Sequence, residues 1–189
     1  MRQRFVGVLV LAGLAAAGSI VRGQEISRGL NVASVSAGFK DVSGDDAGYN
    51  TVDVNVTAER LWGREWSAGL ALDWTRLGAD YYSESWGAVG PLLAVYLTPG
   101  KDGSPYVSAR ATFGFGGDGM SPDGKSGTTL GVGVGYLKLF GSERAGAGVR
   151  VEAGYRHEKY GKSIIGDIIY PEGSRNHARL DVGLTFYLH

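Results

Sequence analysis

Alternation between apolar and polar side chains is the feature that most constrains how this chain can fold. It runs through six segments of more than ten residues: 49–62, 65–76, 105–115, 128–140, 145–157 and 176–188. In segment 145–157, for example, Val149 and Val151 alternate with Arg150. Successive side chains of a β-strand point to opposite faces, so this period predicts strands with one apolar and one polar face.

Two further segments alternate less cleanly. In 30–40, the apolar face carries Ala33, Val35, Ala37 and Phe39, and we assign Asn31, Ser34 and Ser36 to the polar face. Segment 86–97 is apolar on both faces, and Pro91 interrupts it. Because proline cannot donate a hydrogen bond to a neighbouring strand, we expect a bulge or a local break at Pro91. With these two segments the sequence predicts eight strands.

The connections between the segments differ in length in a regular way. Two are tight turns, at Gly63-Arg64 and Gly141-Ser142, and a third, 98–104, is slightly longer. The others are long, at 41–48, 78–85, 116–127 and 158–175. Short turns at one end and long loops at the other are typical of outer-membrane barrels, whose turns face the periplasm. The prediction for residues 24–189 is therefore an all-β, eight-stranded antiparallel up-and-down transmembrane β-barrel.

The N-terminus predicts export. Residues 1–4 form a short region with two arginines, Arg2 and Arg4, and 5–21 form an apolar run rich in small residues. We predict a signal peptide at 1–23, cleaved before Gln24, with 15–17 as a second candidate cleavage site and a membrane anchor helix as the alternative. No other run is long enough for a membrane helix, so a mature chain in a membrane must cross it as a barrel. The expected location is the outer membrane of a diderm bacterium, with both termini in the periplasm.

Composition excludes several classes of function. The chain has no cysteine, so it has no disulfide and no thiolate metal site. Its 19 basic and 19 acidic residues leave no basic excess for a nucleic-acid partner. Three scattered histidines lack the spacing of metal ligands, and we predict no metal and no cofactor. The loops contain five acidic residues that make calcium binding an alternative to a simple solvated loop: Asp41, Asp45, Asp46, Asp118 and Asp123.

Alternation alone does not say which face is outside, because a secreted lipocalin-like barrel turns its apolar face inward. Strand length and aromatic spacing favour a membrane. Trp66 and Trp74 share one face, and eight residues correspond to roughly 26 Å along a strand. We predict two aromatic girdles, one formed at the turn end by Trp62, Trp66, Tyr136 and Phe186, the other at the loop end by Trp74, Phe113, Phe115 and Tyr155. The expected partners are outer-membrane lipids, including lipopolysaccharide.

The polar face carries charges of both signs at mid-strand, namely Asp53, Glu59, Asp73, Arg110, Arg150, Glu152, Arg179 and Asp181. In a membrane barrel these charges point into the lumen, and we predict an ion-pair network formed by Arg110, Arg150, Glu152, Arg179 and Asp181. Arg110 and Arg150 flank segment 128–140, which we expect to present only Gly131, Gly133 and Gly135 to the interior. The alternative is the solvated surface of a soluble barrel. Because side chains nearly fill an eight-stranded lumen, general porin activity is not expected.

The C-terminal segment carries a family resemblance. The segment resembles the terminal insertion signal of outer-membrane proteins at four positions: Asp181, Gly183, Phe186 and Leu188. It departs from that signal by one additional residue at its end, His189. This resemblance implies that barrel assembly machinery is a partner during insertion. Together with the export signal and the strand number, the chain resembles the OmpA-like and OmpX-like family of small outer-membrane barrels.

Two features leave functional alternatives open. Outer-membrane lipid A deacylases are also eight-stranded, and they use a histidine at the rim of the barrel with a serine two positions later. In this chain His157 has Lys159 two positions later, and the next serine is Ser163.

An apolar cluster at Ile164, Ile165, Ile168, Ile169 and Tyr170 predicts a hairpin beyond the membrane, with a partner site as the alternative. We predict no catalytic residue. The expected function is a structural or surface-interaction role through four external loops, with a lipid A deacylase as the alternative.

Overall fold

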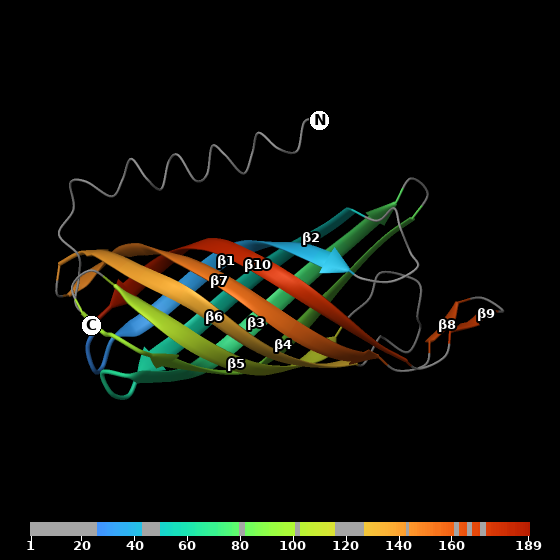
Figure 1. The fold of residues 1–189 in the computed structure, drawn as a ribbon. Helices are drawn as coiled ribbons and strands as arrows, with labels where there is room; N and C mark the ends of the chain where they lie inside the picture. Colours follow the sequence, from blue (N-terminus) through green and yellow to red (C-terminus); the bar gives the residue numbers. More distant parts are fainter. Residues whose placement is uncertain are drawn as a thin grey trace.

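The computed structural model describes residues 26–42, 50–79, 82–100, 103–115, 127–142, 144–160, 163–165, 168–170 and 173–189. Eight long strands form a closed barrel: β1 (Asn31–Val42), β2 (Asn50–Leu61), β3 (Trp66–Ala79), β4 (Tyr82–Tyr96), β5 (Ser104–Phe115), β6 (Gly127–Gly141), β7 (Ala145–Tyr160) and β10 (Gly173–Leu188). Every neighbouring pair is antiparallel, and β10 closes the barrel against β1. The predicted eight-stranded up-and-down β-barrel is confirmed (Figure 1).

Two short strands, β8 (Ser163–Ile165) and β9 (Ile168–Tyr170), pair with each other outside the barrel sheet. In Figure 1 they lie beyond the end of the barrel that is opposite the C-terminus. The backbone therefore agrees with the hairpin expected for this apolar segment. The structure does not describe the side chains of these two strands.

No helix long and apolar enough to cross a bilayer occurs in the part of the chain that the structure describes.

The strands wind around the barrel with a fixed stagger. Register pairs followed once around the barrel from Val42 on β1 return to β1 at Val32, ten residues lower. With a rise of ~3.3 Å per residue and a strand spacing of ~4.8 Å, this stagger tilts the strands by about 40° from the barrel axis. A residue's neighbours across the lumen are therefore set by the stagger as well as by its position along its own strand.

The two faces of the sheet separate as the sequence predicted, with the apolar face outward. Large apolar side chains are exposed on all eight barrel strands, as Val35 on β1, Leu70 on β3 and Val134 on β6 illustrate. The lipocalin-like alternative, which needs the apolar face inward, is therefore wrong. One assignment was also wrong: Asn31 is exposed on the outer face together with Ala33, and Val32 is the buried neighbour. Residues 31 and 33 have the same parity, so a strand that starts at Asn31 must place them on one face.

Pro91 interrupts one ladder without changing its register. On β4, residues 87–89 pair with 113–115 of β5 and residues 92–96 pair with 106–110, so the same register continues on both sides of Gly90 and Pro91. A Cβ on Gly90 would lie 1.9 Å from the carbonyl oxygen of Ala111, which shows how closely the strands approach here. The expected local break is therefore present, and it is not a bulge.

The interior is apolar at the turn end. Ten buried residues form the cluster that we call the turn-end core: Ile26, Leu30, Val32, Leu61, Ala94, Tyr96, Tyr106, Leu137, Leu139 and Tyr187. Leu137 and Leu139 correct the expectation that β6 presents only glycines to the interior. The segment before β1 enters this core, since Gly29 N donates to Leu61 O and Leu61 N donates to Leu30 O, both at 2.9 Å. A positive φ of 87° at Gly29 permits this turn.

Candidate functional site

Charged side chains fill the barrel interior beyond the turn-end core. The five predicted members, Arg110, Arg150, Glu152, Arg179 and Asp181, are all inward and no more than 7% exposed. Three further buried residues join them through ion pairs, namely Glu59, Asp73 and Arg156, and Asp53 is an additional buried carboxylate that accepts a hydrogen bond from Thr75. We call the eight ion-paired residues the lumen cluster. They come from β2, β3, β5, β7 and β10, and they comprise four arginines and four carboxylates.

The first half of the lumen cluster lies next to the turn-end core and is centred on Arg150. This guanidinium forms an ion pair with Glu59 and a second one, at 3.5 Å, with Glu152. The Tyr106 hydroxyl accepts a hydrogen bond from Arg150 Nε at 2.7 Å and donates one to Glu152 at 2.8 Å. The Arg150 guanidinium carbon also lies 4.5 Å from the centroid of the Tyr106 ring. Arg150 is therefore held by charge, hydrogen bonding and ring contact together.

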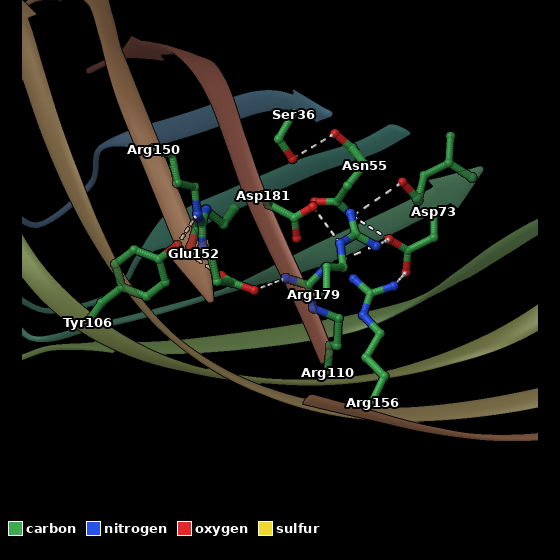
Figure 2. A network of polar contacts seen from close by, with 12 residues as sticks. Ser36, Asn55, Asp73, Tyr106, Arg110, Arg150, Glu152, Arg156, Arg179 and Asp181 are labelled. Carbon is green, nitrogen blue, oxygen red and sulfur yellow. Dashed lines mark hydrogen bonds and ion pairs between the residues drawn. The ribbon is translucent and has the colours of Figure 1, made fainter. Parts of the chain in front are cut away.

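The second half of the lumen cluster is centred on Asp73. Its carboxylate lies 3.0 Å from Arg156, 3.4 Å from Arg179 and 3.8 Å from Arg110. Asn55 Nδ2 donates to Asp73 Oδ1 at 2.6 Å. Figure 2 shows the three arginines approaching Asp73 from separate strands.

The two halves are joined into one network. Arg110 also forms an ion pair with Glu152 of the first half, and Arg179 forms one with Asp181. Each arginine therefore faces at least one carboxylate. A buried charge that lacks such a partner is strongly destabilising, so this matching is what allows the lumen cluster to occupy the interior.

The glycines of β6 make room for this network. A Cβ on Gly131 would lie 3.2 Å from Cγ of both Arg110 and Arg156, and one on Gly133 would lie 2.9 Å from the carboxyl carbon of Glu152. The space predicted at these glycines is present, but its occupants differ in part. Arg156 takes the place expected for Arg150, which pairs in register with Leu137 instead.

The predicted network named none of Glu59, Asp73 and Arg156, although Glu59 and Asp73 belong to the mid-strand charges that we expected in the lumen. Their parity puts all three on the polar face, and this signal is present in the sequence. What parity cannot supply is height in the barrel. One line of register pairs connects Arg156, Arg110 and Glu59, but the stagger makes this line descend toward the turn end as it winds around the barrel, so Glu59 lies next to Arg150 and not next to Arg156. Sequence periodicity does not contain the stagger, so the pairing could not be derived from it.

The predicted girdle residues lie on the outer face wherever their side chains are described. Trp62, Trp66, Tyr136 and Phe186 are exposed toward the turn end, and Trp74, Phe113 and Tyr155 are exposed toward the loop end. The side chain of Phe115 lies outside the described ones. At the turn end, Trp62 and Trp66 stack with their ring centroids 6.4 Å apart. The guanidinium carbon of Arg60 lies 5.7 Å from the centroid of the Trp62 ring.

The proposed insertion signal occupies the strand that closes the barrel. Phe186 and Leu188 point outward, and they are 55% and 61% exposed. Asp181 points inward to Arg179. Gly183 packs against β1, where a Cβ would lie 2.4 Å from the carbonyl oxygen of Val35. The segment therefore presents its two apolar side chains to the outside while its backbone pairs with β1 and β7.

His157 lies on the outer face near the loop end of β7. Its Nδ1 is 2.7 Å from Oδ1 of Asn176 on β10. Ser163, the nearest following serine, begins β8, and its side chain is not among the described ones. The His157 ring lines a groove of about 490 Å³ on the outer face of β4 to β7, together with Tyr155, Leu130 and Pro91.

The acidic loop residues lie largely outside the described residues. Asp45, Asp46, Asp118 and Asp123 belong to segments that are not described, and Asp41 is described only by its backbone in β1. Within the described segments, no group of three or more histidine and acidic side chains has the arrangement of a metal site.

Comparison with known structures finds other barrels. Neisserial surface protein A is 16% identical, and the match covers 84% of this chain and 95% of that one with a TM-score of 0.48. OprG, an outer membrane protein from Pseudomonas aeruginosa, is 8% identical, with 87% and 98% covered and a TM-score of 0.46. Ail, the attachment invasion locus protein of Yersinia pestis, is 12% identical, with 85% and 99% covered and a TM-score of 0.46. No protein-family model matches the sequence. No curated protein matches it either.

Proposed function

We propose that this chain is a bacterial outer-membrane β-barrel whose lumen is closed by its own side chains. Its role is structural, or it interacts with other molecules at the cell surface through its loops. The turn end and both termini face the periplasm. The observation that carries this proposal is the combination of an apolar outer face on all eight strands with a charged interior.

The outer face supports the membrane setting. Large apolar side chains around the whole barrel are 36% to 61% exposed. A soluble barrel with this surface would exceed by far the few hundred square ångströms of contiguous apolar surface that soluble monomers tolerate. A bilayer removes this penalty, and a closed barrel satisfies the backbone hydrogen bonds of every spanning strand.

The interior supports a closed lumen. The turn-end core occupies one end with ten buried residues, and the lumen cluster occupies the middle with eight charged residues. Two aromatic rings, Tyr96 and Tyr106, lie where these layers meet, with centroids 5.7 Å apart. A hydrated ion would have to displace these contacts to pass, so we expect the barrel to be non-conducting in its ground state.

Three measurements test this proposal. The protein should fractionate with the outer membrane and should migrate faster in gels before heating than after it, because a folded barrel resists detergent. In planar bilayers it should give no sustained conductance. Recovery in the soluble periplasmic fraction would overturn the membrane setting, whereas steady open-channel currents would overturn the closed lumen alone.

The second candidate function is lipid A modification. It is favoured by the hydrogen bond between His157 and Asn176 and by the apolar groove beside His157, which offers an oriented imidazole next to a site for an acyl chain. The test is mass spectrometry of lipid A from cells with and without the protein. Loss of an acyl chain that His157→Ala abolishes would establish the enzyme, and an unchanged lipid A profile would reject it.

A further inference from the structure

A second groove on the outer face has a cationic edge. It lies at the turn end across β10, β1, β2 and β3 and has a volume of about 490 Å³. Small side chains form its floor and larger ones its walls; the lining includes Ala33, Ala58, Ala68, Phe186, Leu188 and Arg60. The strand register brings these small side chains together. Ala33 on β1 pairs with Ala58 on β2, and Ala68 on β3 pairs with Arg60, two residues after Ala58 on β2.

The edge of this groove is polar and positively charged. Arg60 is exposed, and its guanidinium carbon lies 5.7 Å from the centroid of the Trp62 ring. Asn31 also lines the groove, and its side-chain amide donates to the Leu188 carbonyl oxygen at 3.3 Å. Trp62 stacks on Trp66 at the same edge. Tryptophan rings favour the boundary between lipid chains and water, so this edge lies at the height of lipid headgroups.

The surroundings of the groove are also basic. In the segment before β1, on β2 and in the turn between β2 and β3, the exposed cations are Arg28, Arg60 and Arg64, and Glu65 of the same turn is an exposed acid. Such an excess attracts negative headgroups at a membrane surface. An apolar channel that ends at a cation therefore has the two properties needed to hold one acyl chain and one phosphate.

We propose that this groove binds an anionic glycerophospholipid from the leaflet at the turn end. One acyl chain lies over Ala33, Ala58 and Ala68, between the Phe186–Leu188 wall and β3, and the phosphate contacts Arg60. This inference rests on the proposed membrane setting and adds a specific lipid site to it. The groove beside His157, on the other strands of the barrel, has the same volume and serves as an internal control.

The experiment is native mass spectrometry of the folded barrel in detergent with added phosphatidylglycerol or phosphatidylcholine of identical acyl chains. We expect the parent to bind phosphatidylglycerol about fivefold more tightly, which is the effect of one cation near a lipid surface. Arg60→Gln should remove this preference. Ala58→Phe should weaken binding of both lipids, because the new ring fills the groove from an outward position.

Two matched variants make the result specific. Lys138→Gln removes a turn-end cation outside the groove, and Ala109→Phe fills the groove beside His157; both should retain the preference of the parent. Equal binding of the two lipids by the parent, or an unchanged preference in Arg60→Gln, would overturn the site. A dimer mass that Ala58→Phe converts to monomer would assign the groove to a second copy and would also overturn it. Heat-modifiable mobility of every variant separates these outcomes from failure of the barrel itself.

Discussion

Arg150 on β7 forms an ion pair with Glu59 on β2 across the barrel interior, although two strands, β10 and β1, separate them in the sheet. Both side chains are at most 5% exposed. The pair therefore joins opposite parts of the wall and does not merely reinforce a ladder between neighbours. It depends on the ten-residue stagger, which brings these two positions to a common height.

Breaking this pair should destabilise the barrel strongly. Glu59→Gln leaves the Arg150 charge buried with weaker compensation, and we expect a loss of about 3 kcal/mol in the free energy of unfolding. The double variant Glu59→Leu/Arg150→Met should recover most of this loss, because it removes both charges together. Urea unfolding in lipid vesicles measures the effect, with the exposed Arg64→Gln as the control. Equal stability of Glu59→Gln and parent would show that the pair contributes nothing.

The glycines of β6 should differ in their tolerance of alanine. A Cβ on Gly135 would lie 2.4 Å from the Tyr106 ring and 2.5 Å from the Val151 carbonyl oxygen, whereas one on Gly131 would meet only flexible arginine stems at 3.2 Å before any backbone atom. Overpacking of a filled interior costs about 1–3 kcal/mol. We expect Gly135→Ala to lose this amount and Gly131→Ala to lose less, as judged by the midpoint of thermal gel-shift curves. The reverse order would contradict the close packing of Gly135 against Tyr106.

A charge on the outer face should separate a membrane barrel from a soluble one. Val134 lies mid-way along β6 and is 60% exposed. Val134→Arg should cost about 2–4 kcal/mol of folding free energy in a bilayer, whereas Thr128→Arg, on the same face at the strand end, should cost less than about 1 kcal/mol. Folding into vesicles at increasing urea gives both values. If the two variants fold equally well, the outer face does not contact lipid.

The segment before β1 should contribute to stability through the turn-end core. Ile26 is completely buried, so Ile26→Ala should cost about 2–5 kcal/mol by the usual cavity effect. Leu97→Ala is a suitable control, because this side chain is 59% exposed. Urea unfolding compares the two variants. A negligible effect of Ile26→Ala would mean that the segment does not occupy the barrel in solution.

The C-terminal aromatic should matter more for assembly than an equivalent aromatic elsewhere. Phe186 and Phe113 are exposed to similar extents, 55% and 58%, so lipid contact alone would make them equivalent. If Phe186 belongs to an insertion signal, Phe186→Ala should reduce the rate of assembly into vesicles that contain barrel assembly machinery, and Phe113→Ala should not. Appearance of the heat-modifiable form over time measures this rate. Matching rates for the two variants would remove Phe186 from the signal.

Period-two alternation predicted seven of the eight barrel strands, because each of them has one face toward the outside and one toward the interior, whereas segment 86–97 of β4 is apolar on both faces. It did not predict the apolar turn-end core. Leu137 and Leu139 have the same parity as Gly131 and Gly135, so nothing in the alternation distinguishes an apolar interior residue from a polar one. The partners of Arg110 and Arg150 were also incomplete, because Glu59 and Asp73 reach them only through the stagger and across the lumen.

The ten-residue stagger means that the width of this barrel can change only in discrete steps. Side chains alternate between the two faces, so the register of one strand pair can change only in steps of two residues without turning a whole strand inside out. Each such step alters strand tilt and barrel radius together. It would also slide one side of the interior past the other and separate Arg150 from Glu59. Single side chains can diverge gradually during evolution, but a wider pore would require a discrete jump in which several charge pairs are exchanged at once.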